Sequence, residues 1–151
     1  MRHDWTVAKE LADTTKLHGG KVVFTNGCFD LFHYGHLESL KFARGLGNAL
    51  IVGLNTDRSV RALKGPARPI MCEKHRVALL SELKCVDAVV LFDEDTPQEL
   101  IEYVRPNILV KGYEYVHKHV AGSNIVENVY YFPNVEGCST TKIIERVKSC
   151  G

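Results

Sequence analysis

Two histidines stand close together in GCFDLFHYGH, residues 27–36, directly after a short apolar run. His33 and His36 flank Gly35, and a helical pattern of apolar residues follows at once. The first N–H groups and the dipole of a helix attract anions, and imidazole can donate hydrogen bonds to phosphate oxygens. The stretch therefore predicts a phosphate site. Taken alone, so short a motif fits equally well with one histidine capping the turn and the other lying in solvent.

A second anion site is predicted at Ser139, Thr140 and Thr141, where three hydroxyl residues open an amphipathic helix. Hydroxyl groups and backbone amides at such a position can bind phosphate together. In isolation, simple N-capping by Ser139 is the more ordinary interpretation. Lys64, in LKGPARP, is expected on a loop from which its ammonium could reach the same ligand, although most loop lysines are merely solvated.

Other chemistries fit these residues less well. Cys28, His33 and His36 could bind zinc, but a fourth ligand at a standard spacing is missing and there is no HExxH. A nucleophile-elbow signature and a Walker lysine motif are absent as well. Two anion sites, two histidines and a lysine suit direct phosphoryl or nucleotidyl transfer, in which positioning and charge stabilisation supply the catalysis.

Apolar runs that read as buried strands alternate with amphipathic runs that read as helices. This alternation predicts an α/β fold: a Rossmann-like parallel five-stranded sheet with helices on both faces, in a single domain over 1–151. Ligands of such sheets bind outside the carboxyl ends of the strands. The expected strands are 21–27, 49–55, 86–92, 107–112 and 129–132, and the expected helices include 5–12, 35–47, 73–83, 97–104 (with Thr96 as N-cap and Pro97 first) and 139–149.

The composition is that of an ordinary globular protein, with 45% hydrophobic and 25% charged residues. The net charge of +1 gives no indication of a nucleic-acid or membrane surface. No signal-peptide core is evident and the apolar runs are too short to span a bilayer, so a cytoplasmic location is expected. The five cysteines form no CxxC pair, and most are expected to fill the interior as reduced thiols.

Two separated motifs, TNGCFDLFHYGHLESLKFAR and CSTTKII, resemble the HxGH and S-T-T motifs of the cytidylyltransferase-like nucleotidyltransferases. The resemblance runs from about residue 21 to about residue 147, so the helix within 1–20 lies outside it. Three further stretches are similar to the adenylyltransferases that act on heptose 1-phosphate. They are VGLNTDRSVRALKGPARPI, FDEDTPQELI and RPNILVKG.

The resemblance implies a role for each matching residue. His33, His36 and Lys64 would be catalytic, with the histidines on the α-phosphate, and Asn55 and Asp57 would bind the acceptor. The implied nucleotide- and phosphate-binding residues are Cys28, Phe29, Asp30, Gly35, Arg76, Lys111, Gly112, Ser139, Thr140 and Thr141.

The implied activity is transfer of a nucleoside monophosphate, expected to be AMP from ATP, to a heptose-like sugar 1-phosphate, with release of pyrophosphate. Mg²⁺ would arrive with the triphosphate, and a homodimer is expected. Three alternatives stay open: a CTP-dependent cytidylyltransferase acting on glycerol 3-phosphate or another polyol phosphate, a nucleotide-binding regulatory module without turnover, and a metal-binding interaction domain that uses Cys28 and the histidines.

One stretch departs from the resemblance. Where the heptose enzymes usually have LVKGGDY, this chain has LVKGYEY, with Tyr113 and Glu114 in place of glycine and aspartate. A tyrosine is therefore expected beside the nucleotide base or the acceptor, where it would alter the substrate. His117 and His119, in the segment that follows, are expected only in a solvated loop.

Overall fold

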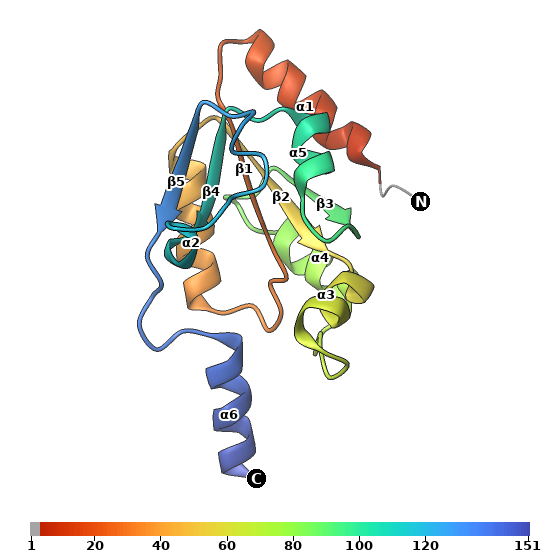
Figure 1. Ribbon diagram of the computed structural model, residues 1–151, viewed down its shortest axis with the longest axis vertical. Helices are drawn as coiled ribbons and strands as arrows, with labels where there is room; N and C mark the ends of the chain where they lie inside the picture. The colour runs from red at the N-terminus through yellow and green to blue at the C-terminus, as the bar shows by residue number, and fades with distance from the viewer. Residues whose placement is uncertain (1–3) are drawn as a thin grey trace.

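All five strands of the sheet run parallel, in the order β3-β2-β1-β4-β5 (Figure 1). The computed structural model describes residues 4–151. From β1 the chain builds outward through β2 to β3 and then returns to place β4 on the other side of β1. The predicted parallel five-stranded sheet is confirmed. Its strands are β1 (Val22–Gly27), β2 (Ala49–Asn55), β3 (Ala88–Phe92), β4 (Ile108–Gly112) and β5 (Asn128–Phe132).

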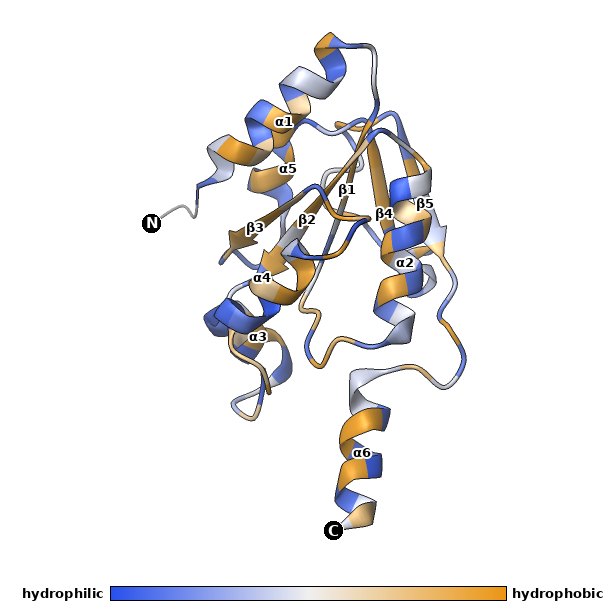
Figure 2. Ribbon diagram, turned by 180° about the vertical axis from the view of Figure 1, so that it is seen from behind, coloured by the Kyte–Doolittle hydropathy of each residue, from blue (hydrophilic) through white to orange (hydrophobic). Residues whose placement is uncertain are grey.

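Helices cover both faces of the sheet, and the alternation of side chains along each strand assigns them to two hydrophobic clusters. Val22 and Phe24 pack toward α1 and α5, whereas Val23 between them packs toward α2 and α4. Figure 2 shows the apolar colouring concentrated on the strands and on the inner sides of these helices. The helices are α1 (Trp5–Leu17), α2 (Tyr34–Gly45), α3 (Asp57–Lys64), α4 (Glu73–Ser81), α5 (Gln98–Val104) and α6 (Thr140–Cys150), with a short 3₁₀ turn, η1, at Tyr113–Tyr115.

The first helix is part of the main core although it precedes the motif region. Trp5, Ala8 and Ala12 of α1 are buried, and the indole Nε1 of Trp5 donates a hydrogen bond to the Leu91 carbonyl at 2.9 Å. Val7, which the sequence pattern also places inward, is 55% exposed. It lies outside the stripe formed by residues 5, 8 and 12, which are spaced to recur on one face of the helix.

Several local predictions are wrong. Helix α5 begins at Gln98, so Pro97 is the residue that precedes the helix and not its first helical residue, and Thr96 is not the N-cap. The Gln98 amide donates a hydrogen bond to the Thr96 hydroxyl at 3.4 Å. Lys64 is the last residue of α3 instead of part of a loop. The cysteines do not fill the interior: Cys28, Cys85 and Cys138 are partly exposed, Cys72 and Cys150 are exposed, and all are free thiols.

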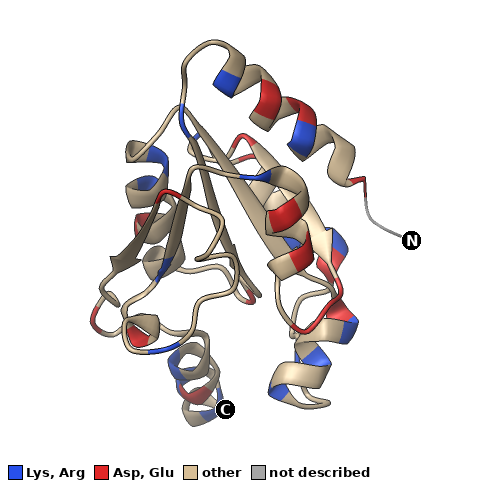
Figure 3. Cartoon of the chain, turned by 45° about the horizontal axis from the view of Figure 1, so that its top comes forward, with Lys and Arg blue, Asp and Glu red and all other residues tan. Residues whose placement is uncertain are grey.

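Charged residues of both signs are distributed over helices and loops (Figure 3). Within residues 4–151, no helix has the length and apolarity that crossing a membrane requires. Helix α6 differs from the others, because it extends away from the sheet and buries none of its residues completely (Figure 1).

Replacing Trp5 should be costly, because its ring is 4% exposed in the core between α1 and the sheet. We expect Trp5→Ala to lower the free energy of unfolding by about 3–5 kcal/mol. The matched control Val7→Ala, on the same helix but exposed, should change it by less than about 0.5 kcal/mol. Urea denaturation followed by circular dichroism measures both. Equal effects of the two changes would show that α1 does not pack as described.

Candidate active site

A cleft of about 930 Å³ opens at the carboxyl ends of the central strands, where a parallel sheet is expected to bind its ligand. It brings together the HxGH stretch after β1 and the S-T-T stretch before α6, which are about a hundred residues apart in sequence. Arg76 and Asp57 do not line it. The predicted residues that do are Cys28, Phe29, Asp30, His33, Gly35, His36, Asn55, Lys64, Lys111, Gly112, Ser139, Thr140 and Thr141.

His33 and His36 cap the first turn of α2 for each other. The backbone N–H of His36 donates to Nδ1 of His33 at 3.4 Å, and the N–H of His33 donates to Nδ1 of His36 at 3.3 Å. The two rings are stacked, with centroids 3.7 Å apart and planes inclined by 22°. Capping and ligand binding are therefore not alternatives here, because the capping contacts use only one nitrogen of each ring.

The capping geometry fixes where each neutral ring carries its proton. Since both Nδ1 atoms accept hydrogen bonds, the proton lies on Nε2, which remains a donor. Burial, reinforced by the nearby charges of His33 and Lys64, lowers the pKa of His36 to about 3. Burial also lowers the pKa of His33. Both rings are thus neutral Nε2–H donors at neutral pH, and His36 packs against Phe29 and Phe32 instead of lying in solvent.

The S-T-T stretch is held against the first motif. The Ser139 hydroxyl accepts a hydrogen bond from the Lys142 amide at 3.1 Å, as an N-cap does, while the Thr140 hydroxyl donates to the Asp30 carbonyl at 2.6 Å. A Cβ atom at Gly35 would lie 3.0 Å from Cβ of Cys138 and from the His33 ring, so a side chain there would push these groups apart by a few tenths of an ångström. The amino termini of α2 and α6 consequently face one cleft.

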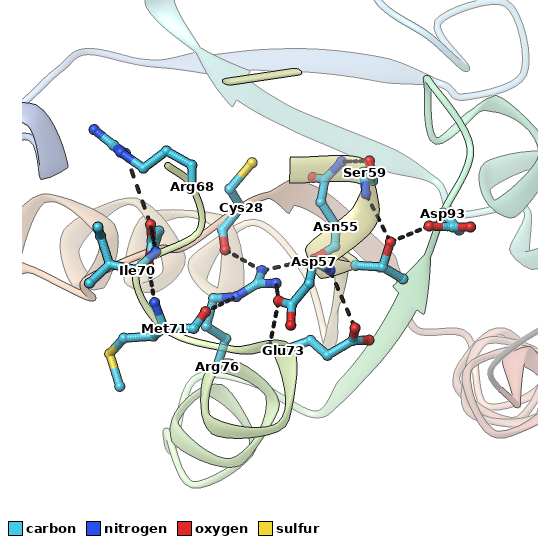
Figure 4. Close-up of polar contacts among 12 residues, drawn as sticks. Cys28, Asn55, Asp57, Ser59, Arg68, Ile70, Met71, Glu73, Arg76 and Asp93 are labelled. Atoms are coloured by element: carbon cyan, nitrogen blue, oxygen red, sulfur yellow. Dashed lines mark hydrogen bonds and ion pairs between the residues drawn. The ribbon is translucent and has the colours of Figure 1, made fainter. Parts of the chain in front are cut away.

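Arg76 occupies a different environment from the one predicted (Figure 4). Its side chain is 1% exposed, and its guanidinium donates to the carbonyls of Met71, Cys28 and Asn55 at 2.9, 2.7 and 2.8 Å. It also pairs with the Asp57 carboxylate at 2.7 Å. Because each guanidinium nitrogen bonds a protein oxygen and the side chain is buried, this geometry does not support a phosphate contact for Arg76 or an acceptor contact for Asp57.

Asp30 shapes the loop between β1 and α2. The residue is 3% exposed, and its carboxylate accepts hydrogen bonds from the Ile70 and Met71 amides at 2.8 and 2.9 Å. Its neighbours Phe29 and Leu31 have φ angles of 47° and 46°, an uncommon region for residues other than glycine. The buried carboxylate therefore holds the loop in a tight conformation beside the histidines.

Lys111 lies at the β4 side of the cleft. Its ammonium donates to Oδ1 of Asn26 at 2.8 Å and lies 4.6 Å from the ring centroid of Tyr115. Burial lowers the pKa of Lys111 to about 8, and the neighbouring Glu114 carboxylate acts in the opposite direction. Lys64, by contrast, reaches the cleft from an exposed position at the end of α3.

The tyrosine that departs from the resemblance does not line the cleft. Tyr113 is 58% exposed and is not among the lining residues, whereas Glu114 and Tyr115 border the cleft. His119 lines it too, contrary to the expectation of a solvated loop only. Asp95 and Thr96 were also missed, although they follow β3 and the carboxyl-end rule could have found them. No sequence signal marks His119, because a long connection brings it there.

Among residues 4–151, no group of three or more His, Cys, Asp or Glu side chains is arranged to hold a metal ion. Cys28, His33 and His36 therefore do not form such a group, and the Nδ1 atoms of both histidines are engaged by backbone amides.

Comparison with known families gives one match over most of the chain: the family model described as cytidylyltransferase-like matches residues 24–146. The chain belongs to the cytidylyltransferase-like family of nucleotidyltransferases. Relatives named "Bifunctional protein HldE" from Helicobacter pylori (strain Shi470) and Campylobacter jejuni (strain RM1221) are each 51% identical over 140 residues. That alignment covers 93% of this chain but 30% of either relative, so the chain spans under a third of their length.

A solved structure shows the same arrangement of elements. The lipopolysaccharide core biosynthesis protein from Thermoplasma volcanium GSS1 superimposes with a TM-score of 0.65 and 29% identity, covering 78% of this chain and 100% of that one. In this cytidylyltransferase-like chain, both family motifs contribute directly to the cleft, whereas Arg76 acts behind it.

Removing the buried guanidinium should destabilise the fold. We expect Arg76→Met to lower the free energy of unfolding by about 3–5 kcal/mol, because it leaves the Asp57 carboxylate and three carbonyls without their donor. The control Arg58→Met removes an exposed ion pair with Asp93 and should change the stability far less than Arg76→Met does. An Arg76 variant of wild-type stability with weakened nucleotide binding would restore the phosphate role instead.

The protonation of the histidines can be read directly by long-range ¹H–¹⁵N NMR. We expect His36 to remain neutral, with its proton on Nε2, between about pH 7 and about pH 5. Because its folded-state pKa of about 3 lies below the ordinary 6.5, the stability linked to this group is present above that ordinary value and is lost as the pH falls toward 3. An imidazolium at His36 above about pH 5, or an Nδ1–H tautomer, would contradict the geometry.

Proposed function

We propose that this chain transfers AMP from ATP to the phosphate group of a heptose-like sugar 1-phosphate and releases pyrophosphate. The observation that carries the proposal is the convergence of two neutral Nε2–H donors and the start of α6 on one cleft. These groups can donate hydrogen bonds to phosphate oxygens without gaining or losing a proton. The choice of ATP and of a heptose-like acceptor rests on the sequence resemblance, while the family model and the relatives named HldE support nucleotidyl transfer to a sugar phosphate.

The reaction is a direct displacement. A phosphate oxygen of the acceptor attacks the α-phosphorus and forms the new P–O bond, while the bond from the α-phosphorus to the bridging oxygen breaks and its electron pair leaves with pyrophosphate. Negative charge shifts among the α-phosphoryl oxygens and the leaving group. In the proposal, His33 and His36 donate to the α-phosphoryl oxygens, and Ser139, Thr140 and Thr141, together with Lys64, hold the departing phosphates.

Among residues 4–151, neither the Cys28 thiol nor the two histidines of the cleft are activated as nucleophiles for a covalent route. Burial raises the pKa of the Cys28 thiol, the nearest candidate, so the thiol stays protonated. The two histidines hold the proton on Nε2 and use Nδ1 for capping, which leaves their rings as donors. A single in-line transfer is therefore the mechanism that we propose.

Magnesium would enter with the triphosphate. The histidines, the residues Ser139–Thr141 and Lys64 present N–H, hydroxyl and ammonium donors, which suit phosphate oxygens rather than a cation. In this proposal the ligands of Mg²⁺ are phosphate oxygens and water, as is common for this ion, and the metal supplies charge neutralisation when bound. The residues of the chain position the phosphates around it.

The proposal is tested by acceptor-dependent pyrophosphate release. ATP, CTP, GTP and UTP are each combined with Mg²⁺ and with heptose 1-phosphates of both anomers, other sugar 1-phosphates, or glycerol 3-phosphate. Turnover with ATP and a heptose 1-phosphate is the expected result. Turnover restricted to CTP and glycerol 3-phosphate would establish the cytidylyltransferase alternative, and nucleotide binding without release in any combination would establish a regulatory module.

Within this reaction, loss of one imidazole donor should slow the chemical step. We expect His36→Ala to lower kcat by about a hundredfold or more, the scale of removing one preorganised donor to a charge that develops in the transition state. The control His75→Ala, at an exposed position of α4 outside the cleft, should keep full turnover. A folded His36→Ala protein with near wild-type kcat would refute the role of His36.

A further inference from the structure

Strand β1 carries, near its end, a side chain to which the family resemblance assigns no role. Asn26 lines the cleft, and so does Lys111 near the end of the neighbouring strand β4. Backbone pairing between the two strands ends with Thr25 and Val110. The connection that follows joins side chains, because the Lys111 ammonium donates a hydrogen bond to Oδ1 of Asn26 at 2.8 Å.

This hydrogen bond fixes the orientation of the Asn26 amide. An ammonium group only donates hydrogen bonds, so the carbonyl oxygen of the amide faces Lys111 and the NH₂ group points away from it. Within residues 4–151, no protein group accepts a hydrogen bond from this NH₂ group, and no fully buried side-chain nitrogen lacks a partner. The Asn26 nitrogen is therefore accessible, and because the residue lines the cleft, it offers N–H donors to a ligand there.

The Asn26 side chain lies on the sheet face that α1 and α5 cover. A Cβ atom added at Gly53, on β2, would lie 3.3 Å from Cβ of Asn26. The same atom would lie 2.7 Å from the Phe24 ring and 3.3 Å from the Leu100 side chain, and both of these belong to the core cluster between the sheet and these two helices. The amide thus reaches the cleft from this face.

The imidazole donors reach the cleft from the other face. His36 packs against Phe29 and Phe32, which lie in the cluster between the sheet and helices α2 and α4. A phosphoryl group at the end of β1 would therefore meet imidazole N–H groups on one side and the Asn26 amide on the other. Charge in phosphoryl transfer is spread over several oxygens that point in different directions, so donors from both faces can stabilise it.

Lys111 is a cation whose hydrogen-bonding partner is neutral. In the described part of the chain, residues 4–151, no carboxylate forms an ion pair with its ammonium, which lies 4.6 Å from the ring centroid of Tyr115. Burial lowers the pKa of Lys111 to about 8, while the Glu114 carboxylate acts to raise it. The positive charge behind the carbonyl oxygen polarises the amide and strengthens its N–H donors. The other titratable groups on the elements around this part of the cleft are Lys118, which lies over the Tyr115 ring, Tyr131 of β5, and Asp95 and His119 of the connecting loops.

We propose that the Asn26 amide donates a hydrogen bond to an α-phosphoryl oxygen of the bound nucleotide, and that Lys111 positions Asn26 for this contact. The inference rests on the proposed nucleotidyl transfer, which identifies the α-phosphoryl group as the ligand. Asn26 becomes a further catalytic residue beside the histidines. Lys111 becomes a positioning residue that acts behind the amide and not on the nucleotide.

Calorimetric titration of α,β-methylene-ATP with Mg²⁺ into the full chain tests the pair without requiring turnover. We expect Asn26→Leu and Lys111→Met each to raise the Kd about tenfold, the effect of losing one hydrogen bond to a charged group. Because Lys111 acts through Asn26, the double variant should bind within about twofold of either single variant, and not about a hundredfold more weakly than the wild type. The matched control Lys118→Met removes an ammonium beside the same Tyr115 ring and should leave the Kd within about twofold of the wild-type value.

A pH series separates positioning from a merely structural role. Between about pH 7 and about pH 9 the wild-type affinity should fall, because Lys111 loses its charge as the pH rises through its pKa of about 8, whereas Lys111→Met should show no such step. Thermal unfolding verifies that each variant is folded.

Unchanged affinity in Asn26→Leu, additive losses in the double variant, or an equal pH step in Lys111→Met would overturn the proposal, and so would no binding of the analogue by the wild type. Failure of the proposed reaction is seen separately, as absent pyrophosphate release by a wild type that still binds the analogue.

Discussion

The buried guanidinium of Arg76 is the interaction on which the rest of the site depends. It joins the Cys28 carbonyl after β1, the Asn55 carbonyl at the end of β2 and the Asp57 carboxylate at the start of α3. Burying a cation is costly unless every donor has a partner, and here protein oxygens supply them. The guanidinium thereby fixes the positions of the strand ends at which the cleft opens.

From this centre, hydrogen bonds continue to the second motif. Arg76 holds the Met71 carbonyl, the Met71 amide donates to the Asp30 carboxylate, and the Asp30 carbonyl accepts from Thr140. The start of α6 is therefore linked through backbone groups to the ends of β1 and β2. This connection matters because α6 itself buries no residue completely, so its position relative to the histidines rests on contacts at its first turn.

The histidines combine a structural and a chemical role through their two nitrogens. Each Nδ1 completes the first turn of α2 by accepting a backbone N–H, which leaves Nε2–H for a ligand. Burial keeps the rings neutral, so they are donors whose proton is neither gained nor lost at neutral pH. A preorganised donor of this kind stabilises developing charge without the cost of reorienting solvent.

The sequence was sufficient to predict the parallel sheet and the meeting of the two motifs, because strand periodicity and the carboxyl-end rule are local or general properties. It could not show that Arg76 is buried, since the oxygens that accept its hydrogen bonds come from three separate places in the chain, at Cys28, at Asn55 and Asp57, and at Met71. It also could not show that His119 lines the cleft, because the hydrogen bond between Gln98 and Gly122 and the packing of Val120 hold the connection after β4 against α5. The exposure of the cysteines likewise depends on tertiary packing.

The central claim is direct transfer of the nucleotidyl group, and the fate of labelled α-phosphate tests it. The chain is incubated with Mg²⁺, [α-³²P]ATP and heptose 1-phosphate. The protein is then separated from the small molecules, and the label in each fraction is measured. The account predicts that the label appears in a nucleotide-sugar product in step with pyrophosphate, with none attached to the protein. Label that becomes covalently attached to the protein and then chases into product, or pyrophosphate released without an acceptor, would contradict it.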